Sequence, residues 1–218
     1  MSDRWATFDC YGTLIDWEAG LRSAFESLWP RADSRRLLFL HHTVEPRIQE
    51  GRAIPYREVL ARSLAAVTAI EGLEAPPGRG GALADSLPRW PSFPEVPPAL
   101  ATARERGWRL AALSNTDPDL LAASLERIGV HFDAAITAAE AGSYKPARGH
   151  WDAFYARTGA EPSRHVHVAA SLFHDIEPAA RLGVSAIWIN RLGESSEVPR
   201  AGELPDLSGL TDALDRLV

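Results

Sequence analysis

Trp5-Ala6-Thr7-Phe8-Asp9-Cys10-Tyr11-Gly12-Thr13 is an apolar run that ends in a carboxylate and continues into a glycine-containing loop. The run is short and apolar, which predicts a buried strand, and the residues after it predict a tight turn. Backbone amides behind such a strand can point at a bound anion, and Gly12 permits close approach. Asp9 in this place suits a nucleophile whose ester or acyl phosphate is then hydrolysed by water. The motif alone fits a strand-capping Asp in a turn equally well.

Four further apolar runs of strand length follow along the chain, and helical patterns separate them. Strands that alternate with helices predict a Rossmann-like α/β fold with a doubly wound parallel sheet. The predicted strands are residues 110–113, 134–137, 165–169 and 185–189, and the predicted helices are residues 98–106, 118–128, 149–158 and 176–182.

Residues 16–75 interrupt this alternation. Apolar side chains recur there at helical spacing without a strand pattern, which predicts a helical cap inserted after the first strand. The Pro- and Gly-rich stretch 75–98 predicts an irregular connection back to the core. We therefore expect an α/β core domain of residues 1–15 and 91–218, and a cap domain with its return linker of residues 16–90.

The composition argues against several classes of partner. The chain has 218 residues, 45% of them hydrophobic, and a formal net charge of −6. An acidic chain with interspersed charges argues against nucleic acid and anionic membranes as partners. The single cysteine, Cys10, allows no internal disulfide. No apolar run reaches the ~20 residues that span a bilayer, and the N-terminus shows no signal-peptide pattern, so we expect a cytoplasmic protein.

Polar residues follow the predicted strands at one edge of the sheet. In open parallel sheets the ligand crevice lies beyond the carboxyl ends of the strands. Asp9, Ser114-Asn115 and Asp175 each follow a predicted strand, and Lys145 lies in a loop that can reach the same rim. Residues that are distant in the sequence are therefore expected to share one site.

These motifs, in this order and at this spacing, resemble those of the haloacid dehalogenase superfamily. The resemblance covers nearly the whole chain, including the helical insertion. It implies a hydrolase with an aspartyl nucleophile at Asp9 and a helical cap over a Rossmann-like core. The residues that carry it are Phe8-Asp9-Cys10-Tyr11-Gly12-Thr13-Leu14, Leu113-Ser114-Asn115, Tyr144-Lys145-Pro146, His174-Asp175 and Ala179-Ala180-Arg181-Leu182-Gly183.

Two positions distinguish the branches of this superfamily. Its phosphatases carry an Asp two residues after the nucleophile as general acid, and a second acidic residue before the last Asp that helps hold Mg²⁺. This chain has Tyr11 and Ala170 there. A tyrosine, with a reference pKa near ~10, is a poor acid for a leaving oxygen, whereas halide leaves without a proton. The resemblance is therefore closest to the metal-independent 2-haloacid dehalogenases (type II), and it implies displacement of halide from a small 2-haloalkanoate without a cofactor.

The resemblance also implies roles for single residues. Asp9 attacks the halogen-bearing carbon while Thr13 stabilises its carboxyl oxygens. Lys145 stabilises charge at Asp9. Asp175 fixes Lys145 and activates the hydrolytic water, although it could instead cap the following helix. Cys10 has no evident activating partner and takes no chemical step. The expected substrate contacts are Cys10, Tyr11, Ser114, Asn115, Ser171, His174 and Trp151.

Several positions depart from the dehalogenase pattern. Ala170 and Leu172 replace a Ser and an Asn that help position water, and Trp151 replaces a tyrosine. His174 is a candidate to take over the positioning of water. The family's cap also presents an arginine to the substrate and halide, and ungapped matching places Leu40 there. The nearby residues that offer a substitute are His41, His42, Arg47 and Arg52.

Three other functions stay open on the sequence. A phosphoric ester hydrolase would hold Mg²⁺ through Asp9, the Tyr11 carbonyl and Asp175. A hydrolase of a strained-ring amino acid would use the same Asp9 ester, and a silent binding protein can share the fold. His165 and His167 share one face of a strand but lack a third zinc ligand, so we expect packed histidines. The expected partner is a small-molecule carboxylate, and the resemblance implies a homodimer.

Overall fold

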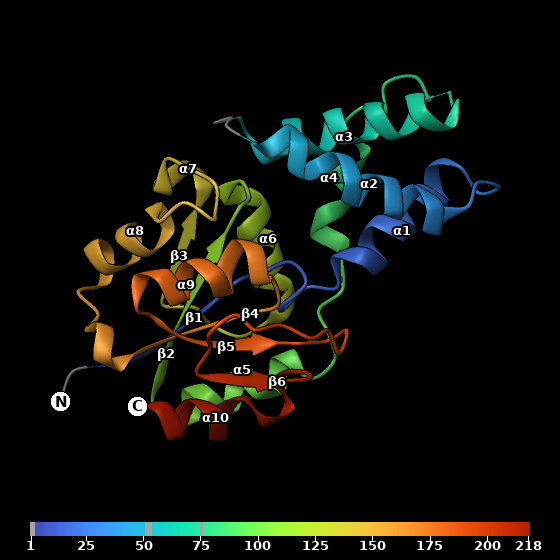
Figure 1. The fold of residues 1–218 in the computed structure, drawn as a ribbon. Coiled ribbons are helices and arrows are strands. Elements are labelled where there is room, and N and C mark those ends of the chain that lie inside the picture. The colour runs from blue at the N-terminus through green and yellow to red at the C-terminus, as the bar shows by residue number, and fades with distance from the viewer. Residues whose placement is uncertain (1–2, 51–53, 75) are drawn as a thin grey trace.

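A computed structural model describes residues 3–50, 54–74 and 76–218 of the chain. Its core is a six-stranded, all-parallel sheet in the order β3-β2-β1-β4-β5-β6 (Figure 1). The order reverses its direction between β1 and β4, and open sheets of this kind bind ligands at that switch point. The predicted fold class is therefore confirmed. The strands are β1 (Arg4–Phe8), β2 (Trp108–Ser114), β3 (Ala134–Thr137), β4 (His165–Ala169), β5 (Ser185–Ile189) and β6 (Gly202–Leu204).

Helices cover both faces of the sheet because successive side chains of each strand point to opposite faces. Ala6 and Phe8 of β1 belong to one apolar cluster, together with residues of α5, α6 and α10. Trp5 belongs to a second cluster that includes residues of α8, and α9 packs on β4 and β5 in a third. These helices are α5 (Val96–Glu105), α6 (Pro118–Ile128), α8 (Gly149–Thr158), α9 (Glu177–Leu182) and α10 (Leu210–Leu217), and the short α7 (Ala138–Ala141) precedes α8.

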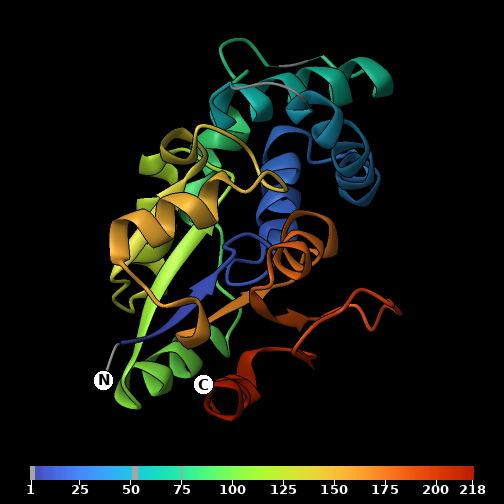
Figure 2. The ribbon, with the colours of Figure 1, turned by 60° about the vertical axis from the view of Figure 1, so that its left-hand side comes forward.

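Four helices between β1 and β2 form the cap, which lies to one side of the sheet in both views (Figures 1 and 2). Asp16 caps the first of them, since its carboxylate accepts the Ala19 N–H at 3.0 Å, and Asp33 caps the second in the same way. The apolar residues predicted from helical spacing pack between these helices. The helices are α1 (Trp17–Leu28), α2 (Ser34–Gln49), α3 (Tyr56–Glu71) and α4 (Ala82–Ser86).

Two connecting segments join the cap to the core, and they run side by side. The Asp16 N–H donates to the Pro91 carbonyl at 2.8 Å, and Ile15 pairs with Ser92 in an isolated β-bridge. Trp90 is buried against Gly20 of α1, where an added Cβ would lie 2.2 Å from the indole. The glycine therefore sets how closely the return segment approaches the cap.

The structure corrects some local predictions. Residues 75–98 were expected to be irregular, yet they contain α4, a 3-10 turn and the start of α5. The strand predicted at 110–113 is longer at both ends, because Trp108 and Ser114 also pair with their neighbours. The strand β6 and the helix α10 were not predicted at all. Within the described ranges, none of the helices combines the length and hydropathy that a bilayer crossing requires.

Candidate active site

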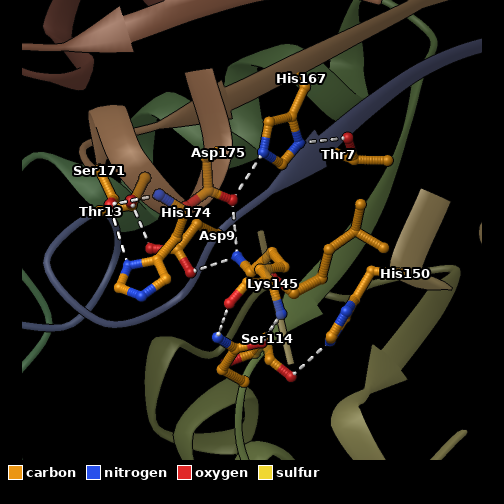
Figure 3. A network of polar contacts seen from close by, with 12 residues as sticks. Thr7, Asp9, Thr13, Ser114, Lys145, His150, His167, Ser171, His174 and Asp175 are labelled. Atoms are coloured by element: carbon orange, nitrogen blue, oxygen red, sulfur yellow. Dashed lines mark hydrogen bonds and ion pairs between the residues drawn. The ribbon is translucent and has the colours of Figure 1, made fainter. Parts of the chain in front are cut away.

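The carboxyl ends of three neighbouring strands bring polar side chains together. Asp9 directly follows the central strand β1, and Ser114 is the last residue of β2 beside it. On the other side, β4 leads into a single π-helical turn, Leu172–Ile176, which carries Asp175. Lys145 enters from the loop between α7 and α8. Figure 3 shows the Lys145 ammonium between the carboxylates of Asp9 and Asp175.

Both carboxylate oxygens of Asp9 are held by neighbours. Lys145 Nζ donates to Oδ1 at 2.8 Å, and Thr13 Oγ1 donates to Oδ2 at 2.9 Å. Thr13 Oγ1 in turn accepts the Ala170 N–H at 2.9 Å, which leaves the hydroxyl proton for Asp9. Asp9 is 8% exposed and lines a cavity. A held carboxylate at a cavity wall has the geometry that a covalent catalyst requires.

Lys145 is buried and completely satisfied. Its ammonium donates to Asp9 Oδ1, to the Leu113 carbonyl at 2.8 Å and to Asp175 Oδ1 at 2.6 Å, which uses all three donors. Burial alone would lower the pKa of Lys145, but the charges of Asp175 and Asp9 outweigh it and raise the pKa above its usual value. The side chain therefore stays cationic at neutral pH.

Asp175 is a fully buried carboxylate that accepts hydrogen bonds from two side chains. Its Oδ1 accepts from Lys145 and from His167 Nε2, the latter at 3.0 Å. Burial alone would raise the pKa of Asp175, but Lys145 and His167 outweigh it and lower the pKa below its usual value. Its Oδ2 has no hydrogen-bond partner among the described residues. Asp175 does not cap the following helix, because α9 begins after Ile176 and has no side-chain cap.

A line of buried hydrogen bonds continues from Asp175 into the core. Thr7 Oγ1 lies 2.8 Å from His167 Nδ1 and 2.7 Å from His165 Nε2. The other nitrogen of His165 lies 2.7 Å from the Tyr155 hydroxyl. If Asp175 is the final acceptor, His167 carries its proton on Nε2, and the donors then run in order from Tyr155 to Asp175. One neutral tautomer of each histidine satisfies the whole line.

Ser114 and Asn115 have different places in the site. The Asn115 side-chain amide accepts the Lys145 N–H at 2.6 Å and donates to the Lys145 carbonyl at 3.0 Å. Both polar atoms of the Asn115 side chain therefore hold the backbone of Lys145, and Asn115 acts mainly in fixing the lysine loop. Ser114 Oγ, in contrast, is buried and unpartnered in the described chain, although Ser114 lines the cavity. Its hydroxyl is the better candidate to contact a ligand.

The cavity has a volume of about 580 Å³ and lies between the core and the cap. Core residues form one wall and cap residues form the other, so a ligand would touch both. The core wall includes Asp9, Tyr11, Phe93, Ser114, Asn115, Lys145, Ser171, His174, Asp175, Trp188 and Arg191, and the cap wall includes Trp17, Glu18, His42, Glu45, Pro46, Gln49 and Tyr56.

Comparison with known proteins identifies the family. A family model described as haloacid dehalogenase-like hydrolase matches residues 4–183. The chain belongs to this family of hydrolases. Among curated proteins, it is 28% identical to haloacetate dehalogenase H-2 of Moraxella sp. (strain B), covering 97% of this chain and 96% of that protein. It is also 32% identical to a phosphoserine phosphatase of Thermus thermophilus, covering 87% of this chain and 72% of the relative.

The fold agrees with solved structures of the same family. The L-2-haloacid dehalogenase of Xanthobacter autotrophicus, with chloropropionic acid covalently bound, superimposes with a TM-score of 0.86 and 21% identity over 100% of both chains. At this identity the likeness shows the fold. The resemblance stated from the motifs is confirmed, and the relatives include both dehalogenases and a phosphatase.

Two of the expected substrate contacts in this hydrolase do not reach the cavity. Cys10 is fully buried beneath the loop, and burial raises the pKa of its thiol well above the usual value. Trp151 is 1% exposed and packs edge-on against His167, with ring centroids 5.4 Å apart. Both assignments are corrected, because each side chain points into the core. Tyr11, Ser114, Asn115, Ser171 and His174 do line the cavity.

The residues that could replace the expected cap arginine lie in different environments. Leu40 packs against the apolar core, and His41 is fully buried between Trp17 and Phe25. Arg47 is exposed and does not line the cavity, while Arg52 lies outside the described residues. His42 does line the cavity, stacked on the indole of Trp17. Of the described candidates, His42 alone can face a ligand.

The donors around Asp9 do not fit the magnesium alternative. Asp9 and Asp175 share the Lys145 ammonium, so a cation already lies between the two carboxylates. The position of the third carboxylate is Ala170, whose side chain offers no oxygen. His165 and His167 pair with Thr7 instead of facing a metal site.

Sequence reasoning missed several cavity residues. Arg191 follows β5 at the same edge of the sheet, so the strand-end rule that found Asp9 and Asp175 could have found it too. Its guanidinium donates to the Thr13 carbonyl at 2.8 Å and pairs with Glu95 at 2.7 Å. Arg191 therefore braces the Asp9 loop. The cap residues Glu45, Gln49 and Tyr56 carried no comparable signal in the sequence.

Proposed function

We propose that this hydrolase displaces halide from a small 2-haloalkanoate through a covalent ester on Asp9, without a metal ion. The observation that carries the proposal is the Lys145 ammonium shared by Asp9 and Asp175 at one wall of the cavity. This arrangement supplies a nucleophile, a fixed positive charge and a second carboxylate within one site. The relatedness to curated haloacid dehalogenases supports the same reaction.

The first step forms the ester. Asp9 Oδ attacks the carbon that bears the halogen, and the carbon–halogen bond breaks so that halide leaves with the bonding electron pair. No proton is needed in this step, which suits a site in which Tyr11 takes the place of a general acid. The Tyr11 hydroxyl bonds Ser124 at 3.0 Å, and burial raises the pKa of Tyr11 above its usual value, so it is a poor proton donor. Ser114 lines the cavity, and we assign its buried Oγ, which has no partner among the described residues, to contact the substrate carboxylate or the halide.

The second step hydrolyses the ester. Water attacks the carbonyl carbon of Asp9, and the bond from that carbon to the ester oxygen breaks. The 2-hydroxy acid leaves with this oxygen, which came from Asp9, and the water oxygen stays in the Asp9 carboxylate. The unpartnered Oδ2 of Asp175 is the base that we assign to this water. Lys145 stabilises the negative charge that develops on the Asp9 carbonyl oxygen. The sum is one haloacid and one water converted into one hydroxy acid, one halide ion and one proton.

The proposal is tested with 2-chloropropanoate in the presence and absence of a metal chelator. We expect halide release that the chelator leaves unchanged and that Asp9→Asn abolishes. Asp33→Asn serves as a matched control, because Asp33 caps α2 away from the cavity and Asn caps equally well. It should keep the wild-type rate.

Three other results of these assays would each indicate a different function. Hydrolysis of an aryl phosphate that requires Mg²⁺, without halide release from any haloalkanoate, would contradict the proposal and favour a phosphatase. A gain of one water without halide, on a strained-ring amino acid, would favour ring opening by the same Asp9 ester. If no substrate is turned over and no adduct forms on Asp9, the remaining interpretation is a binding protein without catalytic activity.

A further inference from the structure

The cap wall of the cavity carries a carboxyl group, that of Glu45 on α2. His42, Glu45 and Gln49 lie at intervals of three and four residues along α2, so they share one face of the helix. All three line the cavity. The described cap residues at this wall include no lysine or arginine. A ligand held at Asp9 therefore has a carboxyl group as its partner across the cavity.

Two donors hold the Glu45 side chain in place. Its Oε1 accepts the Tyr56 hydroxyl at 2.9 Å and the Gln49 amide at 2.8 Å. Its Oε2 has no hydrogen-bond partner among the described residues, and Glu45 lines the cavity. We take Oε2 to be the atom that a ligand can reach. The carboxyl group is thus oriented with one oxygen occupied and one available.

Tyr56 ties this carboxyl group to the core. The N–H groups of Tyr56 and Arg57, at the start of α3, donate to the Asp117 carboxylate at 2.8 and 2.9 Å. The Tyr56 ring also stacks on Tyr11, two residues after Asp9, with ring centroids 6.4 Å apart. Contacts from both sides therefore fix Glu45 relative to Asp9.

Charges around the cavity disfavour a second carboxylate on the ligand. Lys145 is occupied by Asp9 and Asp175, and Arg191 by Glu95 and backbone carbonyls. Burial lowers the pKa of His42, so it is neutral near pH 7. Burial also raises the pKa of Glu45 to about 7, and a donor or a positive charge beside Oε2 would favour its ionised form.

We propose that Glu45 selects 2-haloalkanoates whose far end donates a hydrogen bond, such as a hydroxyl or an ammonium group, over those that end in an alkyl group or a second carboxylate. This inference rests on the proposed function. A cavity of about 580 Å³ is several times larger than a two- or three-carbon substrate needs, so a longer substrate fits. Leaving Glu45 without a partner when an alkyl group binds would cost affinity, because buried polar groups require hydrogen bonds.

The test compares pairs of substrates that differ in one group. We would measure kcat/KM for 2-chloroalkanoates of increasing length with a terminal hydroxyl, and for the alkyl analogues of the same size. In the wild type the best hydroxyl compound should exceed its analogue by at least about tenfold, and Glu45→Leu should remove most of that ratio. Glu45→Gln should improve use of 2-chlorosuccinate, because it removes the like charge. Glu58→Gln on α3, which does not line the cavity, should keep the wild-type ratios.

A binding measurement separates this inference from the proposed reaction. The affinities of ω-hydroxyalkanoates of increasing length and of the alkanoates of the same size, which carry no halogen and cannot react, would be measured by calorimetry on the wild type and on Glu45→Leu. Preference for the hydroxyl compound in the wild type alone would support the role of Glu45 even if no halide were released from any substrate. If the ratio of hydroxyl to alkyl compound, in kcat/KM and in affinity, is the same in the wild type and in Glu45→Leu, the inference is overturned. Halide release in the same assays would still support the proposed function. Folding of each variant would be checked by its thermal unfolding.

Discussion

His167 holds the carboxylate that the proposed mechanism uses to activate water. Its Nε2 lies 3.0 Å from Asp175 Oδ1, and its ring packs against Trp151, where the resembled dehalogenases have a tyrosine. The indole N–H of Trp151 has no partner among the described residues, so Trp151 does not replace the missing hydroxyl. In this chain, the hydrogen bond to Asp175 comes from the strand β4 underneath. His167 thereby acts as a positioning residue for Asp175.

We predict that His167→Leu slows ester hydrolysis more than ester formation. Asp175 would lose one of the two hydrogen bonds to Oδ1, and hydrogen bonds to charged groups contribute about 1.5–3 kcal/mol. The expected result is a roughly tenfold or greater fall in kcat, with a larger steady-state fraction of Asp9 ester in intact-protein mass spectrometry. His131→Gln, at an exposed histidine, is the control. A fall in kcat without accumulated ester would contradict this role.

Single residues could be predicted from the sequence where one rule connects position to place. Asp9 and Asp175 follow strands, and the strand-end rule brings them together. The burial of Cys10 and Trp151 could not be predicted, because it depends on which face of a loop or helix meets the sheet. Glu45 was missed for a related reason. Its partner Tyr56 lies on another helix, and only the packing of α2 on α3 brings the two together.

The junction between cap and core depends on one close contact between elements. Gly20 of α1 lies against the buried indole of Trp90, which precedes the return to the core. The Trp90 Nε1–H donates to Ser86 Oγ at 2.9 Å, so the indole is held in that orientation. A larger residue at position 20 must therefore move either the helix or the return segment.

We predict that Gly20→Ala destabilises the protein although alanine is the better helix former. The new Cβ would lie 2.2 Å from Trp90 Cγ, and overpacking of this kind costs about 1–3 kcal/mol. The gain in helix propensity, up to about 1 kcal/mol, offsets only part of it. Urea unfolding measures the difference. Gly80→Ala is the matched control, since an added Cβ there meets no atom within 4 Å. Equal stability of Gly20→Ala and the wild type would disprove the contact.

Elements were predictable in proportion to the length and regularity of their patterns. The buried strands β3, β4 and β5 begin and end where their apolar runs do. The strand β6 has three residues, and only one of them, Leu204, is apolar in the way that a core strand requires. Short elements of this kind are stabilised by their neighbours, here by pairing with β5, which a single run of sequence does not reveal.

At the scale of the whole molecule, buried histidines make the free energy of unfolding depend on pH. Burial lowers the pKa of His41 and His165 to about 3 and that of His150 to about 4. Between pH 4 and the reference pKa of 6.5, the unfolded chain therefore binds protons that the folded chain does not. Stability falls as pH falls through that window. Glu45 acts in the opposite direction, because burial raises its folded pKa to about 7.

We predict a loss of about 3 kcal/mol in the free energy of unfolding when pH is lowered from about 7 to about 5. The three histidines together outweigh the single opposing carboxyl group. Urea unfolding at the two pH values measures the change. His41→Leu should reduce the loss, because it removes one buried group that the unfolded chain protonates, whereas His131→Gln at the surface should not. Equal stability at both pH values would contradict the account.

The family and the fold of the whole molecule were predictable, because several motifs directly follow strands, and the carboxyl ends of parallel strands meet at one edge of the sheet. The character of the cap wall was not, since it depends on how two helices face a cavity that no local pattern describes. The resemblance implied an arginine from the cap at the position of Leu40, which packs against the apolar core, and the described cap wall carries Glu45 five residues later. The substrate is therefore the part of the function for which the structure adds most to the sequence.

The most direct measurement of the central claim follows oxygen through one turnover in water enriched in heavy oxygen, with enzyme in excess over a 2-haloalkanoate. If Asp9 forms an ester, water attacks its carbonyl carbon, so the heavy oxygen enters the peptide that contains Asp9 and the first hydroxy acid released carries none. Heavy oxygen in the first product, with none in that peptide, would mean that water attacks the substrate directly, and the covalent role of Asp9 would be wrong.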